Sequence, residues 1–197
     1  MKHSLQLVEQ VRRGLFLAAS RTYAEQYVEP IIREKYKLLE PSSDDHDAIS
    51  VTGVKYEIKA CKVLRLPENS ATDRSILDRV LYENMIDEVA RAIPFDRCLS
   101  DDFLANIQNV KRTHFELLIY VLLFKDLVKV FEVKSIDIKT GKIPSWSDKH
   151  GRYDAEGMSG QFPITRNTIE FHIDNYLKDT LDYSEVTESL MKLSDVK

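Results

Sequence analysis

Two carboxylates and a lysine stand close together in the first third of the chain. Nine residues separate Asp47 from Glu57, and Lys59 follows Glu57 at the second position. Carboxylate oxygens are ligands that suit Mg²⁺, and a bound Mg²⁺ can polarise a phosphate and lower the pKa of an attacking water. A lysine beside them would stabilise the negative charge that develops. These residue types predict metal-dependent hydrolysis of a phosphodiester.

A strand-turn-strand pattern is expected to bring these side chains together. A short β-prone segment follows Asp47, a Thr-Gly turn comes next, and residues 54–64 then alternate between two faces. Glu57 and Lys59 are two residues apart, so they share one face of their strand. The short turn folds Asp47 back toward that strand, which predicts that the three side chains meet at one edge of a sheet.

This arrangement resembles the PD-(D/E)XK nucleases. In that family an aspartate precedes a short apolar strand, a glycine turn and a second apolar strand that carries the (D/E)XK string, and here these residues are Asp47 and Glu57-Ile58-Lys59. His46 stands where the family signature has its proline. The resemblance implies that Asp47 and Glu57 bind Mg²⁺ and that Lys59 is the catalytic lysine.

The same resemblance implies one more glutamate, from the helix that precedes the aspartate. Glu25 and Glu29 both qualify, because they are one helical turn apart and lie on overlapping faces. We favour Glu25 slightly, since Ala18, Val28 and Ile32 share its face and would turn it inward. The choice between the two glutamates stays open.

A second E-x-K string, Glu132 and Lys134 around a valine, lies on another predicted strand. Asp126 precedes Glu132 by only six residues, which leaves no room for a strand, a turn and a return strand. Asp126 fits better as the turn of a hairpin between 115–124 and 127–138. We therefore expect this second string to be structural or DNA-facing rather than catalytic.

The whole chain is predicted to form one nuclease domain, 1–197, of the α/β class. Its restriction-endonuclease-like core would hold a mixed central β-sheet flanked by helices. The expected segments are an N-terminal helix that kinks or restarts at Pro30, a catalytic core over about 15–138, a helix over 70–93, a basic loop over 139–166 and C-terminal helices over 167–193. The loop and the last helices are expected to serve DNA contact or dimerisation.

Basic, amide and aromatic side chains mark the candidate DNA-contacting positions, most of them in the basic loop. Cations suit phosphates, and amide or guanidinium groups suit base edges; the alternative is a surface loop anchored by its tryptophan. Lys111 and Arg112 could line the same cleft. The predicted DNA-binding residues are Lys62, Lys142, Trp146, Lys149, His150, Arg152, Gln161 and Arg166.

Composition limits the function classes but does not select one. The net charge of −4 over 197 residues counts against nucleic-acid binding, although positive charge can be confined to one cleft. The longest apolar run has eight residues, so no membrane partner is expected. Two cysteines without a CxxC pair indicate a reducing cytoplasm. The sequence has no P-loop, GxGxxG, GxSxG or HExxH motif.

The sequence thus predicts a type II restriction endonuclease that uses Mg²⁺ to cleave both strands of a short double-stranded DNA site. A homodimer is expected, because one active site per chain and a palindromic target imply two-fold symmetry. One alternative is a DNA repair or structure-specific nuclease with the same core, which would prefer flaps or lesions. Another is a non-catalytic interaction protein, on which metal would have no effect.

Overall fold

The computed structural model describes residues 4–19, 22–41, 43, 45–66, 88–148 and 159–195. Its strands are β1 (Ala48–Ile49), β2 (Lys55–Lys62), β3 (Leu64–Arg65), β4 (Phe103–Val110), β5 (Leu117–Leu123), β6 (Leu127–Lys134), β7 (Gly160–Thr165) and β8 (Leu177–Asp182). Its helical segments are α1 (Leu5–Leu17), the π-helix η1 (Thr22–Val28), α2 (Glu29–Tyr36), α4 (Glu88–Arg91), the 3₁₀-helix η3 (Phe95–Arg97), α5 (Ser135–Lys139), α6 (Ile169–Tyr176) and α7 (Tyr183–Ser194).

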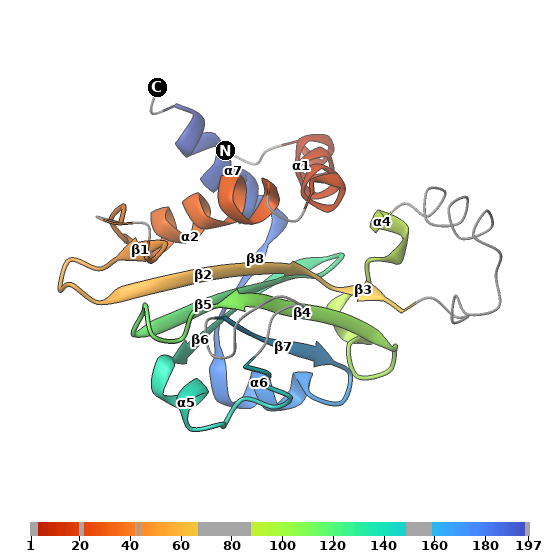
Figure 1. Ribbon diagram of the computed structural model, residues 1–197. Helices are drawn as coiled ribbons and strands as arrows, with labels where there is room; N and C mark the ends of the chain where they lie inside the picture. The colour runs from red at the N-terminus through yellow and green to blue at the C-terminus, as the bar shows by residue number, and fades with distance from the viewer. Residues whose placement is uncertain are drawn as a thin grey trace, which may run out of the picture.

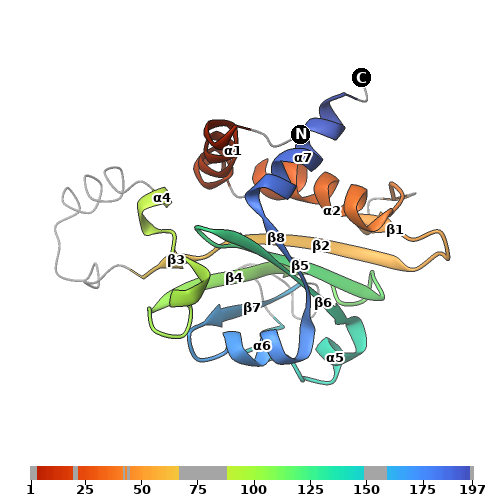
Figure 2. The ribbon, with the colours of Figure 1, turned by 180° about the vertical axis from the view of Figure 1, so that it is seen from behind.

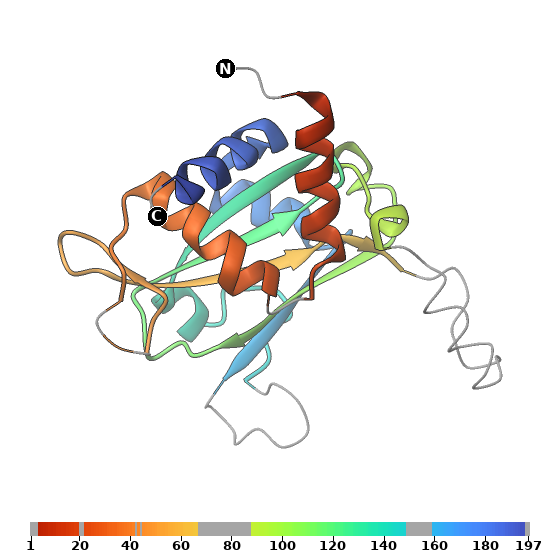
Figure 3. The ribbon, with the colours of Figure 1, turned by 90° about the horizontal axis from the view of Figure 1, so that it is seen from above.

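The larger sheet is mixed and has the strand order β1-β2-β5-β6-β8. Strands β2 and β5 are parallel, whereas the other neighbours pair in antiparallel fashion. Helices α1, α2 and α7 lie together over one face of this sheet (Figures 1 and 3). The predicted α/β class and the mixed sheet flanked by helices are therefore confirmed.

The side chains of the central strand β5 show that the larger sheet is covered on both faces. Its side chains from Leu118 to Leu123 are all buried. Leu118, Tyr120 and Leu122 belong to the core that faces the smaller sheet, while Ile119, Val121 and Leu123 belong to the core beneath the helices. A strand covered on both faces reads as a continuous apolar run, and that run is what the sequence shows.

The smaller sheet has the order β3-β4-β7 and packs against the larger one through the first of these cores. Buried Phe103, Ala105 and Ile107 alternate along β4, and Phe162 and Ile164 alternate along β7. Pro163 is tolerated because β7 is an edge strand. Helices α5 and α6 lie on the side of the molecule opposite α1 and α2 (Figures 1 and 2).

Several predicted segments differ from the structure. The loop 139–166 contains a strand, β7, and the C-terminal helices 167–193 are interrupted by β8, which pairs with β6. The hairpin of β5 and β6 is confirmed, but its second arm ends at Lys134 and the chain then turns into α5. Most of the predicted helix 70–93 lies outside the described residues, which include only its last part, α4.

The N-terminal helical region restarts earlier than Pro30. Helix α1 ends at Leu17, and Ala18 is extended. The chain then forms η1 and passes directly into α2, whose first turn contains Pro30. Proline is well placed there because the first helical N–H groups have no partner within the helix. Within the described residues, no helix combines the length and the apolar character needed to cross a membrane.

Candidate active site

The β1–β2 hairpin places Asp47 beside the strand that carries Glu57. Ala48 pairs with Tyr56 in antiparallel register, and the main-chain N–H of Asp47 donates to the Tyr56 carbonyl at 2.9 Å. The Asp47 carboxylate then accepts a hydrogen bond from the main-chain N–H of Ile58 at 2.7 Å. The predicted return of Asp47 to this strand is therefore confirmed, and its side chain is fixed by the backbone of β2.

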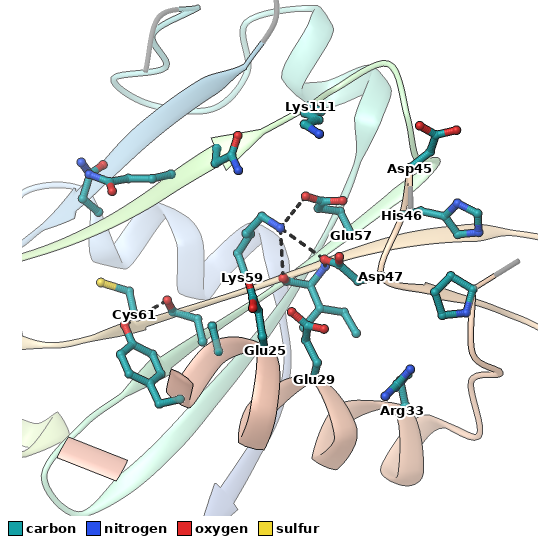
Figure 4. Close-up of a pocket in the computed structure, with 18 of the residues that line it drawn as sticks. Glu25, Glu29, Arg33, Asp45, His46, Asp47, Glu57, Lys59, Cys61 and Lys111 are labelled. Atoms are coloured by element: carbon teal, nitrogen blue, oxygen red, sulfur yellow. Dashed lines mark hydrogen bonds and ion pairs between the residues drawn. The ribbon is translucent and has the colours of Figure 1, made fainter. Parts of the chain in front are cut away.

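Lys59 is the point at which the oxygens of this site meet. Its ammonium lies 3.2 Å from Oδ2 of Asp47 and 3.3 Å from the carbonyl oxygen of Ile58, and it forms an ion pair with Glu57. Figure 4 shows the lysine reaching between the two carboxylates. Three oxygens, two from β2 and one from Asp47 just before β1, thus surround one cationic atom, which brings the predicted trio together.

Burial makes this cluster electrostatically unusual. The side chain of Glu57 is 6% exposed, against 20% for Lys59 and 24% for Asp47. Burial, together with the charge of Asp47, raises the pKa of Glu57, although Lys59 opposes that change. Burial disfavours the charged form of Lys59, but the two carboxylates outweigh it and raise the pKa of the lysine. The lysine is therefore held in its charged form by the pair of acids.

The trio lines the wall of a cavity of about 1090 Å³ that is open to solvent. The helical segment η1–α2 forms a second wall with Glu25, Glu29 and Arg33, and β4 forms a third. Tyr23 ties the helical wall to the sheet, because its hydroxyl donates to the Ala60 carbonyl at 3.2 Å. Short π-helical segments are frequent at functional sites, and here one supplies a wall of the cavity.

Glu29 differs from Glu25 in its electrostatic setting. Glu25 is exposed, whereas Glu29 is half-buried. Burial and the nearby charge of Asp47 raise the pKa of Glu29 to about 8. The argument that Glu25 turns inward assumed an α-helical face, but η1 is a π-helix with a different side-chain periodicity. Both glutamates line the cavity.

The residues at this site fit a magnesium ion. Two carboxylates and a main-chain carbonyl converge on one cationic group, and these hard oxygens are suitable Mg²⁺ ligands. No group of three acidic, histidine or cysteine side chains poised to hold a metal occurs in the part of the chain that the structure describes. Mg²⁺ usually takes one or two protein carboxylates and keeps several waters, so Asp47 and Glu57 are the two carboxylates here that could hold one.

The second E-x-K string lies on β6, inside the larger sheet. Glu132 lies on β6 and forms an ion pair with Lys178 of β8, whose ammonium also stands 5.0 Å from the centre of the Tyr36 ring. Lys134 is exposed at the end of β6. These contacts give Glu132 a structural role across β6 and β8.

The position of Lys62 contradicts the prediction that this residue contacts DNA. Its ammonium is buried and donates to the carbonyls of Phe16 and Ala18, at 2.8 and 2.7 Å, where α1 ends. It also stands 4.9 Å from the centre of the Tyr23 ring. Since strand side chains alternate, Lys62 must face the opposite side from Lys59. A lysine at a helix C-terminus satisfies carbonyls that lack partners.

The remaining predicted DNA-binding residues fall in different places. Trp146 packs against the core and its indole N–H donates to Asp148 at 2.9 Å, while Lys142 pairs with Asp137 at 2.7 Å. Gln161 lies on β7 and accepts a hydrogen bond from Asn106, a cavity residue. Exposed Arg166 pairs with Asp102 at 3.3 Å. Lys149, His150 and Arg152 lie outside the described residues.

The sequence interpretation missed the side chains that β4 contributes to the cavity. Asn106, Gln108 and Asn109 line it beside Lys111, whose charge lowers the pKa of Glu57 against the larger effect of burial. Apolar residues at every second position from 103 to 107 were a signal for this strand. Nothing in the local pattern shows that β4 would lie across the cavity from β2.

His46 is a further cavity residue, directly before Asp47. It is 3% exposed, and neither ring nitrogen has a hydrogen-bond partner within the described residues. Burial of an unpaired imidazole costs free energy, so its position next to Asp47 points to a ligand or water at this end of the cavity. Figure 4 shows it beside Asp45 and Asp47.

No protein-family model matches the chain, and a search of curated proteins returned no match.

Proposed function

We propose that this protein is a Mg²⁺-dependent endodeoxyribonuclease of the type II restriction class, with Asp47, Glu57 and Lys59 as its catalytic residues. The proposal is carried by one observation: two carboxylates and a main-chain carbonyl surround the Lys59 ammonium at the wall of a large open cavity. A merely solvated strand face would leave these side chains exposed, whereas Glu57 is buried.

Each residue has a defined task in this proposal. Asp47 and Glu57 would hold Mg²⁺, which supplies Lewis-acid activation of the phosphate and a more acidic bound water. Lys59, kept charged by the two acids, stabilises negative charge on the scissile phosphate. The hydrogen bond from the Ile58 N–H fixes the orientation of Asp47. Such preorganised charges act without reorganisation cost during the reaction.

Glu29 is the better supported of the two helical glutamates in this proposal. Its raised pKa, about 8, is close to the pH at which a general acid or base works best. Glu29 can therefore hold or release a proton of a water in the cavity. Glu25 stays a candidate at the same wall, because it also lines the cavity.

The partners and the setting of the protein complete the proposal. The substrate is double-stranded DNA, and cleavage of both strands of a palindromic site calls for a homodimer with two-fold symmetry. Cys61 and Cys98 are both free thiols, which suits the reducing cytoplasm.

Digestion of a defined plasmid with Mg²⁺ tests this function, with Lys59→Ala as the comparison. Discrete fragments from the wild type that vanish in the variant would support a site-specific endonuclease. A smear would keep the nuclease and overturn the restriction class. Preferred cutting of flaps or lesions would favour a repair nuclease. Folded wild-type protein that cleaves no DNA with Mg²⁺ or Mn²⁺ would overturn the proposal and favour the interaction protein.

A further inference from the structure

The β4 wall of the cavity is interrupted by a β-bulge. The pairing of β4 with β7 shifts between Ile107 and Val110, so Gln108 and Asn109 stand opposite a single residue, Gln161. Asn109 takes a left-handed backbone conformation with φ 56°, which asparagine tolerates better than most residues. Bulges re-aim side chains and are frequent beside active sites. This bulge places the amide side chains of Gln108 and Asn109 at the wall of the cavity, next to the amide of Gln161 on the neighbouring strand β7.

A fourth amide extends this group toward the interior. The Asn106 side chain donates to Gln161 Oε1 at 3.0 Å, while its own Oδ1 is buried and has no hydrogen-bond partner within the described residues. A buried amide oxygen without a partner costs about 1–3 kcal/mol. Because Asn106 lines the cavity, a ligand that brings a hydrogen-bond donor to this oxygen would recover that cost.

The two sides of the cavity therefore carry different chemistry. The side made by β2 and its neighbours presents Asp47, Glu57 and Lys59, which suit a metal and a phosphate. The side made by β4 presents neutral amides together with Lys111. Amides offer paired donors and acceptors, which phosphates do not need but base edges do, and asparagine and glutamine match the N6 and N7 edge of adenine.

We propose that this amide cluster, defined as Asn106, Gln108, Asn109 and Gln161, reads base edges of the bound DNA and selects adenine at one position of the site. This inference rests on the proposed function. The buried Oδ1 of Asn106 accepts from an exocyclic base amine, and exposed Gln108 supplies a second contact. Cleavage chemistry and base recognition are thus assigned to opposite walls of one cavity.

Selection of bound duplexes from a randomised DNA library tests the inference, with Ca²⁺ in place of Mg²⁺ to hold off cleavage. The wild type is expected to enrich a short motif that contains adenine. Gln108→Ala and Asn106→Ala should each lose the preference for adenine at one position by about ten- to a hundred-fold. Thermal melting checks that the variants are folded, and the exposed position of Gln108 makes that variant the safer one.

Gln10→Ala is the matched control, because Gln10 is an exposed glutamine on α1, and it should enrich the wild-type motif. The same motif from wild type and both cluster variants would overturn the inference and leave a nuclease intact. Binding without base preference would do likewise. Motif binding without Mg²⁺-dependent cleavage would overturn the proposed function and keep the inference. If the wild type binds no duplex, both are overturned.

Discussion

The two E-x-K strings of this chain have the same residue types on neighbouring parts of one sheet, yet they differ in almost every contact. On β2, Lys59 forms ion pairs with the buried Glu57 and with Asp47, at the wall of the cavity. Around β6, Glu132 pairs across the sheet with Lys178. The difference lies in what the neighbouring chain supplies: a hairpin returns an aspartate to β2, whereas β8 gives β6 a lysine. The same residue types on two strands therefore make different contacts, because different segments of the chain surround them.

Substitution of Glu57, the glutamate of the β2 string, is expected to have the largest effect on the rate of DNA cleavage. Glu57→Gln should lower the rate of Mg²⁺-dependent DNA cleavage by at least about a thousand-fold, since metal catalysis contributes several kcal/mol to the barrier. Glu132→Gln, the matched variant on β6, should stay within about two-fold of the wild type. Initial rates of plasmid nicking measure both. Equal losses in the two variants would show that the strings are not distinct in function.

The second largest difference is expected between the lysines of the two E-x-K strings, Lys59 on β2 and Lys134 on β6. Lys59→Ala should lower the cleavage rate by about a hundred- to a thousand-fold, because it removes the charge that stabilises the phosphate. Lys134→Ala removes an exposed lysine at the end of β6 and should leave the rate unchanged. Single-turnover rates at saturating Mg²⁺ make the comparison. A Lys59→Ala variant that cleaves normally would leave the lysine with a purely structural role.

Glu29, which lines the cavity beside β2, is expected to make the free energy of unfolding depend on pH. Its pKa in the folded chain is about 8, above its ordinary 4.5, so the folded chain keeps a proton that the unfolded chain loses between these values. The free energy of unfolding contributed by Glu29 therefore falls as the pH rises through this window. Glu29→Gln should raise the Tm by about 2–4 °C at about pH 9 and by much less at about pH 5.

Thermal melting across that pH range, without added metal, measures the Glu29 effect. Glu188→Gln is the control, because Glu188 is an exposed glutamate on α7, and its Tm should follow the wild type at both pH values. A Glu29→Gln variant with the same shift in Tm at both pH values would contradict the raised pKa of Glu29, which burial and the charge of Asp47 produce together.

The smallest effect is expected at the pair of Glu132 and Lys178. Both side chains are about 30% exposed, at 28% and 31%, and partly solvated ion pairs contribute only about 0–1 kcal/mol to the free energy of unfolding. A double-mutant cycle with Glu132→Gln and Lys178→Met, followed by urea denaturation, measures the coupling. A much larger coupling would mean that the second string is as strongly organised as the first.

Part of the candidate site follows from local rules in the sequence. The alternation of strand side chains places Glu57 and Lys59 on one face, and the Thr-Gly turn returns Asp47 to the same strand. The same alternation puts Lys62 on the face opposite Lys59, which argues against the predicted DNA contact, but its burial against the end of α1 depends on tertiary packing. The apolar run of β5 likewise predicts a strand buried on both faces.

The sequence by itself therefore determined the β1–β2 hairpin that returns Asp47 to Glu57 and the buried central strand, because these depend on residues close together in the chain. Only the tertiary structure decided that β4 faces β2 across the cavity, that β8 supplies a partner for Glu132, and that burial and the charge of Asp47 raise the pKa of Glu29. Those relations join segments far apart in sequence. Their outcome depends on how the sheets and helices pack, and burial then sets the charges of the site.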